Sequence, residues 1–107
     1  MYHITRTQDW QKAQAEGSYQ ADSLLKEGFI HCSDQEQIIA TANRYYRGAG
    51  GLLLLKIDET RLQAGVRREN LEGGSILFPH IYGPLNLDAV VAVYPFIPGE
   101  DGLFSLP

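Results

Sequence analysis

The side chains best suited to acid–base chemistry are three histidines and one glutamate that lie in unusual stretches of the sequence. His31 belongs to the run GFIHCS, His80 lies between two prolines, and His3 lies in a short β-type run near the start. Glu69 follows two arginines and supplies a carboxylate. Imidazole exchanges protons near neutral pH and also binds metals. Together these side chains are suited to proton transfer, or to binding a small polar ligand.

Two kinds of site are compatible with three histidines. Three imidazoles and an open position would suit zinc or iron in a metal-dependent enzyme. No two of the histidines form a close pair such as H-E-x-x-H or H-x-H, so we expect no metal. The second kind is a ligand cleft in which neutral histidines hydrogen-bond, Tyr82 offers a stacking face and Glu69 offers a carboxylate. Alternatively, Glu69 forms a surface ion pair with Arg67 or Arg68.

The residues around His31 place it at a junction between a strand and a helix. Ser33 and Glu36 have the spacing of a capping box, which predicts that a helix begins at Asp34. The first helical N–H groups and the helix dipole could hold an anion there. The alternative is a histidine that only bonds a loop carbonyl. Cys32 could be activated by the helix start, but we favour a small buried side chain.

The composition indicates one globular domain that needs no disulfide. The 107 residues include a single cysteine, carry a formal net charge of -4, and show neither a signal-peptide pattern nor an apolar stretch of membrane-spanning length. We therefore expect a cytoplasmic protein without membrane association. The acidic charge argues against non-specific nucleic-acid binding, although pairs such as Arg67 with Arg68 or Arg44 with Arg47 could hold one phosphate. The sequence does not indicate an oligomeric state.

The elements that must position the candidate residues alternate between strands and helices. The patterns predict strands at Tyr2 to Thr5, Leu52 to Ile57, Val66 to Glu69 and Asp88 to Phe96, and helices at Thr7 to Glu16 and Asp34 to Arg47. The second and fourth strands should be buried on both faces. The two prolines and the glycine around His80 predict that no long regular element forms there. We expect Ile97 to Pro107 to be a loosely ordered tail.

Several phrases of the sequence resemble one bacterial family over nearly the whole chain. They are Tyr2-His3-Ile4, Trp10, GFIHCS, Thr41-Ala42-Asn43-Arg44-Tyr45-Tyr46, FPHIYGPL and Asp88-Ala89-Val90. They are similar to those of the family called domain of unknown function 952, whose uncharacterised members are grouped by fold with the ADP-ribosyltransferases. The resemblance implies a split mixed sheet with a central cleft that holds NAD. The tRNA 2'-phosphotransferases, which use NAD with arginine and histidine residues, are an equally good analogy.

The resemblance also implies roles for particular residues. His3 would hydrogen-bond the ribose on the nicotinamide side, His31 would lie across the same cleft, and Glu69 would stabilise the cationic ribose. The chain has no clean H-Y-E or R-S-E pattern. Tyr82 or Tyr46 would therefore have to serve as the tyrosine that stacks on nicotinamide.

We therefore predict a single α+β domain over residues 1–107, with two main helices on a split mixed sheet that resembles the ADP-ribosyltransferase fold. One cleft should be lined by His3, His31, Ser33, Glu69, His80 and Tyr82. The expected catalytic residues are His31, Glu69 and His80, and the expected cofactor-binding residues are His3, Ser33, Arg67 and Tyr82.

The expected function is an NAD-dependent ADP-ribosyl or phosphate transferase. Its partner would be a nucleotide, with nucleic acid considered only as an acceptor. The alternatives are a non-catalytic nucleotide or small-molecule binding protein, and a metal-dependent enzyme that uses three histidines. His31 and His80 should lie within side-chain reach of each other in each of these sites.

Overall fold

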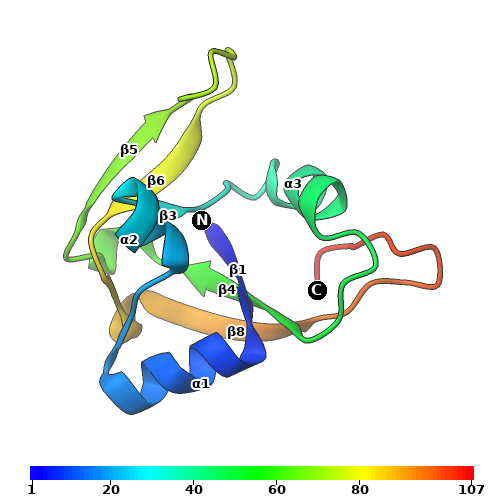
Figure 1. Cartoon of the computed structure of the whole chain (residues 1–107), viewed down its shortest axis with the longest axis horizontal. Coiled ribbons are helices and arrows are strands. Elements are labelled where there is room, and N and C mark those ends of the chain that lie inside the picture. The colour runs from blue at the N-terminus through cyan, green and yellow to red at the C-terminus, as the bar shows by residue number, and fades with distance from the viewer.

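A computed structural model describes all 107 residues of the chain as an α+β arrangement (Figure 1). The strands are β1 (Tyr2–Arg6), β2 (Ser18–Tyr19), β3 (Ile30–His31), β4 (Leu52–Ile57), β5 (Gly65–Glu69), β6 (Phe78–Tyr82), β7 (Leu85–Asn86) and β8 (Val90–Phe96). The helices are α1 (Thr7–Glu16), α2 (Asp22–Glu27) and α3 (Ile38–Tyr45), with short 3₁₀ helices η1 (Glu59–Arg61) and η2 (Leu87–Ala89). The predicted α+β class is confirmed.

The strands form sheets in the orders β1-β4-β8 and β3-β6-β5, and β2 pairs with β7. Every pairing is antiparallel, so the expectation of a mixed sheet is wrong. An apolar run such as Leu52–Ile57 is typical of parallel sheets, which are covered on both faces. Here an antiparallel strand is covered in the same way, and the run therefore does not reveal the direction of its neighbours.

Strand β4 lies between two hydrophobic clusters, as predicted for a strand buried on both faces. Leu52 and Leu54 pack with Ile38 and Ala42 of α3, whereas Leu55 and Ile57 pack in the cluster that contains α1, β3 and β6. In Figure 1, α1 and α3 accordingly lie on different sides of the β1-β4-β8 sheet. The prediction for β8 is wrong in one respect, because it is an edge strand on which alternate residues are exposed.

The two larger sheets meet at a single pair of residues and then separate. Tyr2 and Ser33 exchange two backbone hydrogen bonds of 2.8 and 2.9 Å. Backbone groups of alternate residues point to the same edge of a strand, so those of Ile4 also point toward β3. The next pair of this ladder would join Ile4 to His31. Instead, the carbonyl of His31 accepts a hydrogen bond from the His3 side chain, and the sheet is split at this point.

Helix α3 begins later than the predicted Asp34 because the expected capping box does not form. The extended backbone of Ser33 is engaged with Tyr2, and its hydroxyl donates to Thr41 Oγ1 at 3.3 Å. The side chain of Gln37 instead reaches back to accept from the N–H of Asp34 at 2.9 Å. The helix therefore runs over Ile38–Tyr45, after a turn.

Strand β6 forms despite the proline within it, contrary to the expectation of an irregular segment. The carbonyl of Pro79 accepts from the N–H of Cys32 at 3.0 Å. In an extended strand the nitrogen of the same residue points to the same edge, and a proline nitrogen has no hydrogen to donate. The ladder of β3 with β6 accordingly ends at the pair His31 and His80, where a proline is tolerated.

The segment from Ile97 to Pro107 is ordered by one aromatic residue, so the expected loose tail is wrong. Phe104 is only 5% exposed, and its ring stacks on Phe96 with centroids 4.6 Å apart. Its N–H donates to the Asn43 side chain of α3 at 2.7 Å. The apolar residues of this segment are separated by glycines, prolines and acids without a helical or strand period, and the packing of Phe104 is therefore invisible in the sequence. None of the helices combines the length and apolar character needed to span a membrane.

Candidate functional site

One face of the β3-β6-β5 sheet gathers most of the candidate residues. His31 is paired with His80, and His80 with Arg67. Alternate residues of a strand share a face, so Tyr82 and Glu69 lie on this face as well. Five of the seven candidates are therefore side by side: His31, Arg67, Glu69, His80 and Tyr82. We call this set the histidine face.

The carboxylate of Glu69 organises the centre of the histidine face. Its Oε1 accepts a hydrogen bond from the Tyr82 hydroxyl and another, of 2.9 Å, from Nδ1 of His80. These two bonds hold the pKa of Glu69 below its usual value, the larger effect coming from Tyr82, and the carboxylate stays ionised. The same carboxylate raises the pKa of Tyr82.

The other ring nitrogen of His80 is available to a ligand. His80 is 5% exposed, and its ring stacks on Phe29 with centroids 4.2 Å apart. Every fully buried side-chain nitrogen or oxygen has a hydrogen-bond partner, whereas Nε2 of His80 has none from the protein. This atom therefore reaches the surface. Because Nδ1 carries the proton that Glu69 accepts, Nε2 of the neutral ring is a proton acceptor.

His31 forms a second carboxylate–imidazole pair beside the first. Its Nε2 lies 2.7 Å from Oε2 of Glu27, and its side chain is about half exposed. The rings of His31 and His80 lie edge to face with centroids 5.3 Å apart. The predicted proximity of these two histidines is confirmed.

The two neighbouring arginines of β5 have different environments. Arg68 faces away from the histidines and is held in ion pairs with Asp34 at 3.0 Å and Glu59 at 2.7 Å. Arg67 lies over the ring of Tyr82, with its guanidinium carbon 4.7 Å from the ring centroid. Arg67 is therefore the cation that an anionic ligand on the histidine face would meet.

His3 lies apart from the histidine face, inside the split of the sheet. Its Nδ1 donates to the carbonyl of His31 at 2.6 Å, and its Nε2 lies 2.8 Å from the Tyr19 hydroxyl. That hydroxyl is also 3.0 Å from Thr5 Oγ1. Burial lowers the pKa of His3 to about 4, and the ring is neutral at physiological pH. A ligand can hydrogen-bond the His3 ring only by replacing one of these protein partners.

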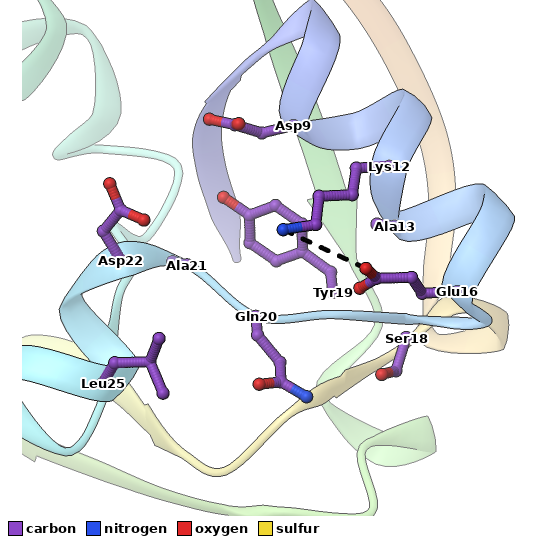
Figure 2. A pocket seen from close by; sticks show the side chains of 10 residues that line it. All are labelled: Asp9, Lys12, Ala13, Glu16, Ser18, Tyr19, Gln20, Ala21, Asp22 and Leu25. Carbon is purple, nitrogen blue, oxygen red and sulfur yellow. Dashed lines mark ion pairs between the residues drawn. The ribbon is translucent and has the colours of Figure 1, made fainter.

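A cleft of about 220 Å³ follows the split and includes His3 and His31 in its lining. A smaller hollow of about 130 Å³ continues it between α1 and α2. Figure 2 shows the side chains of Asp9, Tyr19 and Asp22 together at this hollow. The expectation of one cleft lined by six candidates is wrong, because only His3 and His31 of them line it. The others occupy the sheet face or, for Ser33, the junction of the two sheets.

Ser33 and Cys32, at the predicted helix start, are both buried by other parts of the protein. Ser33 is 3% exposed and its hydroxyl is bonded to Thr41. Cys32 is buried as favoured, and burial raises the pKa of its thiol to about 12. Activation of this cysteine by a helix start, which was the alternative, is wrong because the helix begins at Ile38.

No three side chains among the histidines, cysteine, aspartates and glutamates are placed to hold a metal ion together. The three-histidine metal site is not formed, because His3 is turned into the split while the other two histidines lie on the sheet face. The two ring nitrogens of His3 are hydrogen-bonded to the His31 carbonyl and the Tyr19 hydroxyl.

The sequence reasoning missed Glu27, Phe29 and Tyr19. Phe29 precedes His31 by two residues on the same face of an extended chain, and this spacing carried a usable signal. Glu27 ends α2 and meets His31 across the turn at Gly28, an arrangement that the spacing alone does not indicate. Tyr19 lies in a two-residue strand without any periodicity. Only the structure places its hydroxyl beside His3.

Comparison with known proteins gives the chain a family. The family model described as protein of unknown function (DUF952) matches residues 4–93. A crystal structure of protein CC0527 from Caulobacter crescentus is 33% identical, covers 98% of this chain and 92% of that chain, and has a TM-score of 0.87. A solution NMR structure of CC0527 is also 33% identical, covers 95% and 88%, and has a TM-score of 0.83. A comparison with curated proteins finds no match.

These comparisons indicate no catalytic function, and the relation to ADP-ribosyltransferases stays a prediction. The match spans both GFIHCS and FPHIYGPL, the stretches that supply the two paired histidines. On this evidence the chain belongs to the DUF952 family of proteins of unknown function.

Proposed function

We propose that the histidine face binds a phosphate-bearing nucleotide and transfers a group from it, with NAD as the donor to be tested first. The observation that carries the proposal is the pair of imidazoles 5.3 Å apart, each held by its own carboxylate. One imidazole can accept the proton that the acceptor loses, while its neighbour can hydrogen-bond the bound nucleotide or the acceptor. Arg67 supplies a cation for the phosphate at the edge of the same face.

The proposed ADP-ribosyl transfer breaks the bond between ribose C1' and the nicotinamide nitrogen. The electron pair of that bond leaves with nicotinamide, which becomes neutral, while a lone pair of the acceptor forms the new bond to C1'. The acceptor's proton passes to an imidazole nitrogen, for which Nε2 of His80 is the candidate. The carboxylate of Glu69 stabilises the positive charge that develops on the ribose.

A second candidate function is nucleotide binding without turnover, and one observation favours it. Oε1 of Glu69 already accepts from both Tyr82 and His80, and Phe29 covers the ring of His80. These contacts would hold the face rigid for recognition while reducing the charge available to a transition state. Such a protein would bind the nucleotide and release no nicotinamide.

The variant Glu69→Gln separates the two functions because it keeps the shape of the side chain and removes its charge. For a transferase we expect NAD affinity within a few-fold of wild type and nicotinamide release slowed by about a hundredfold or more. Glu72→Gln is the matched control, since Glu72 lies in the exposed loop that follows β5. Binding is measured by calorimetry, and release by chromatography with protein and nucleic-acid acceptors supplied.

The outcomes of this experiment test the catalytic function, the role of Glu69 and the identity of the ligand separately. Wild-type binding without release over hours would exclude the transferase and support the binding protein. Release that is equal in wild type and Glu69→Gln would remove Glu69 from the mechanism. Absence of NAD binding would remove NAD as the ligand.

A further inference from the structure

The carbonyl of His31 is held by a side chain at a place where a sheet would normally supply a backbone partner. The bonds between Tyr2 and Ser33 start an antiparallel ladder, whose next bonded pair would be Ile4 and His31. The ring of His3 occupies this position and donates to the His31 carbonyl at 2.6 Å. The ring therefore keeps β1 and β3 apart and still satisfies the carbonyl.

The His3 ring is itself fixed by two further side chains. A carbonyl can only accept, so Nδ1 of His3 carries the hydrogen, and Nε2 of the neutral ring must accept from the Tyr19 hydroxyl. The Tyr19 hydroxyl is also in contact with Thr5 Oγ1 at 3.0 Å, which fixes its position from the other side. A continuous set of hydrogen bonds thus connects Thr5, Tyr19 and His3 with the carbonyl of His31.

On the side of the split the His31 carbonyl is held by the His3 ring, whereas the flanking residues Cys32 and Ser33 are bonded to Pro79 and Tyr2. Strand β3 has two residues, and its ladder with β6 stops where Pro79 has no hydrogen to donate. The side chain of His31 is about half exposed and its partner Glu27 is exposed as well. The direction of the His31 ring relative to His80 therefore depends on how the backbone is held from the side of the split.

We propose that His3, oriented by Tyr19 and Thr5, is a positioning residue that sets the placement of His31 beside His80. The inference rests on the proposed function, in which His31 and His80 act together. It assigns to His3 a role through the His31 backbone in place of a direct bond to a ribose. A ligand in the cleft that these residues line would then affect the histidine face, because a ligand that displaces Tyr19 releases the ring of His3 and with it the carbonyl of His31.

The test uses ligand-free protein, and its result is therefore independent of whether NAD binds. Imidazole ¹⁵N and ring ¹H resonances of His31 are followed against pH, together with exchange of the Cys32 amide, which reports the last hydrogen bond to β6. The groups that face the His31 ring are Glu27 of α2 and His80 of β6, while His3 of β1 faces its backbone. A displacement of the ring relative to Glu27 and His80 therefore changes its titration curve.

Tyr19→Phe removes only the hydroxyl that orients His3, and Tyr46→Phe is the matched control in the same cleft. We expect Tyr19→Phe to displace the His31 titration curve and to speed exchange of the Cys32 amide by about five- to tenfold, the effect of losing one hydrogen bond. Tyr46→Phe should change neither. His3→Ala should reproduce the effect, and His3→Asn should restore the wild-type curve, because its amide can still donate to the His31 carbonyl.

An unchanged His31 curve in both Tyr19→Phe and His3→Ala would overturn the proposal. Faster amide exchange with an unchanged His31 curve would also overturn it, since His3 would then have a purely structural role. If neither NAD nor another nucleotide binds but the curve moves as expected, the positioning role stands and the proposed function fails.

Discussion

The buried His3 ring makes the stability of the protein depend on pH in a defined window. The pKa of His3 falls from 6.5 to about 4 in the folded protein, mainly because burial removes the charged form from water. The unfolded chain therefore binds more protons than the folded chain between these two values. Protonation draws the protein toward the unfolded state, and the free energy of unfolding decreases as the pH falls from about 6.5 to about 4.

The size of the effect follows from the gap between the two pKa values. At 1.36 kcal/mol per pH unit, the gap corresponds to about 3 kcal/mol, with no further loss from His3 below about pH 4. This loss is a large part of the 5–15 kcal/mol that typically stabilises a domain. The variant His3→Asn keeps a donor for the His31 carbonyl and does not titrate.

Urea unfolding followed by the fluorescence of Trp10, measured in steps from about pH 7 to about pH 4, gives the free energy of both proteins. The lowered pKa of Glu69 also makes the free energy of unfolding decrease on acidification. This contribution is present in both proteins and cancels in the comparison. We expect the free energy of the wild type to fall by about 3 kcal/mol more than that of His3→Asn. Parallel curves, or an NMR titration of His3 near its ordinary pKa, would refute the reasoning.

Three further predictions concern other regions of the chain. Phe104→Ala should lower the free energy of unfolding by about 3 kcal/mol, whereas Leu106→Ala should change it by less than about 1 kcal/mol; equal values in denaturant titrations would mean that the C-terminal segment is not packed as described. Arg67→Ala should weaken binding of a phosphate-bearing nucleotide by about 1.5 to 3 kcal/mol, and calorimetry that finds Arg67→Ala no weaker than the surface control Arg61→Ala would exclude its contact. Cys32, buried and with a raised pKa, should react with a thiol reagent at neutral pH only after urea unfolds the protein, and rapid reaction in native buffer would contradict its burial.

The sequence predicts those features that depend on local periodicity. Helix α1 has the predicted bounds, and the apolar run of β4 is buried on both faces as expected because leucines on each side meet a separate cluster. The proximity of His31 and His80 also follows from their neighbours, since Ile30 and Ile81 drive the two segments into one core.

Features that depend on distant partners are absent from the sequence pattern. Ser33 and Glu36 satisfy a local rule for a helix start. The backbone of Ser33 instead pairs with that of Tyr2 in an extended conformation, and the helix therefore does not begin there. Phe104 has its partner in Phe96, and Tyr19 has its partner in His3. No local pattern near either residue encodes these contacts. The division of the candidates between a cleft and a sheet face depends on such contacts, and sequence reasoning therefore merged them.

The missing hydrogen of Pro79 also protects the histidine face against errors of strand alignment. A slip of one residue between β3 and β6 would turn His31 toward the core and bring Ile30 and Cys32 to the surface. Two-residue strands have few bonds with which to resist such a slip. Pro79 lies at the end of this ladder, and an alignment that moved it into the middle of the pairing would cost a bond between two strands that have few. The residue that ends the pairing thus favours the alignment in which both histidines face the same way.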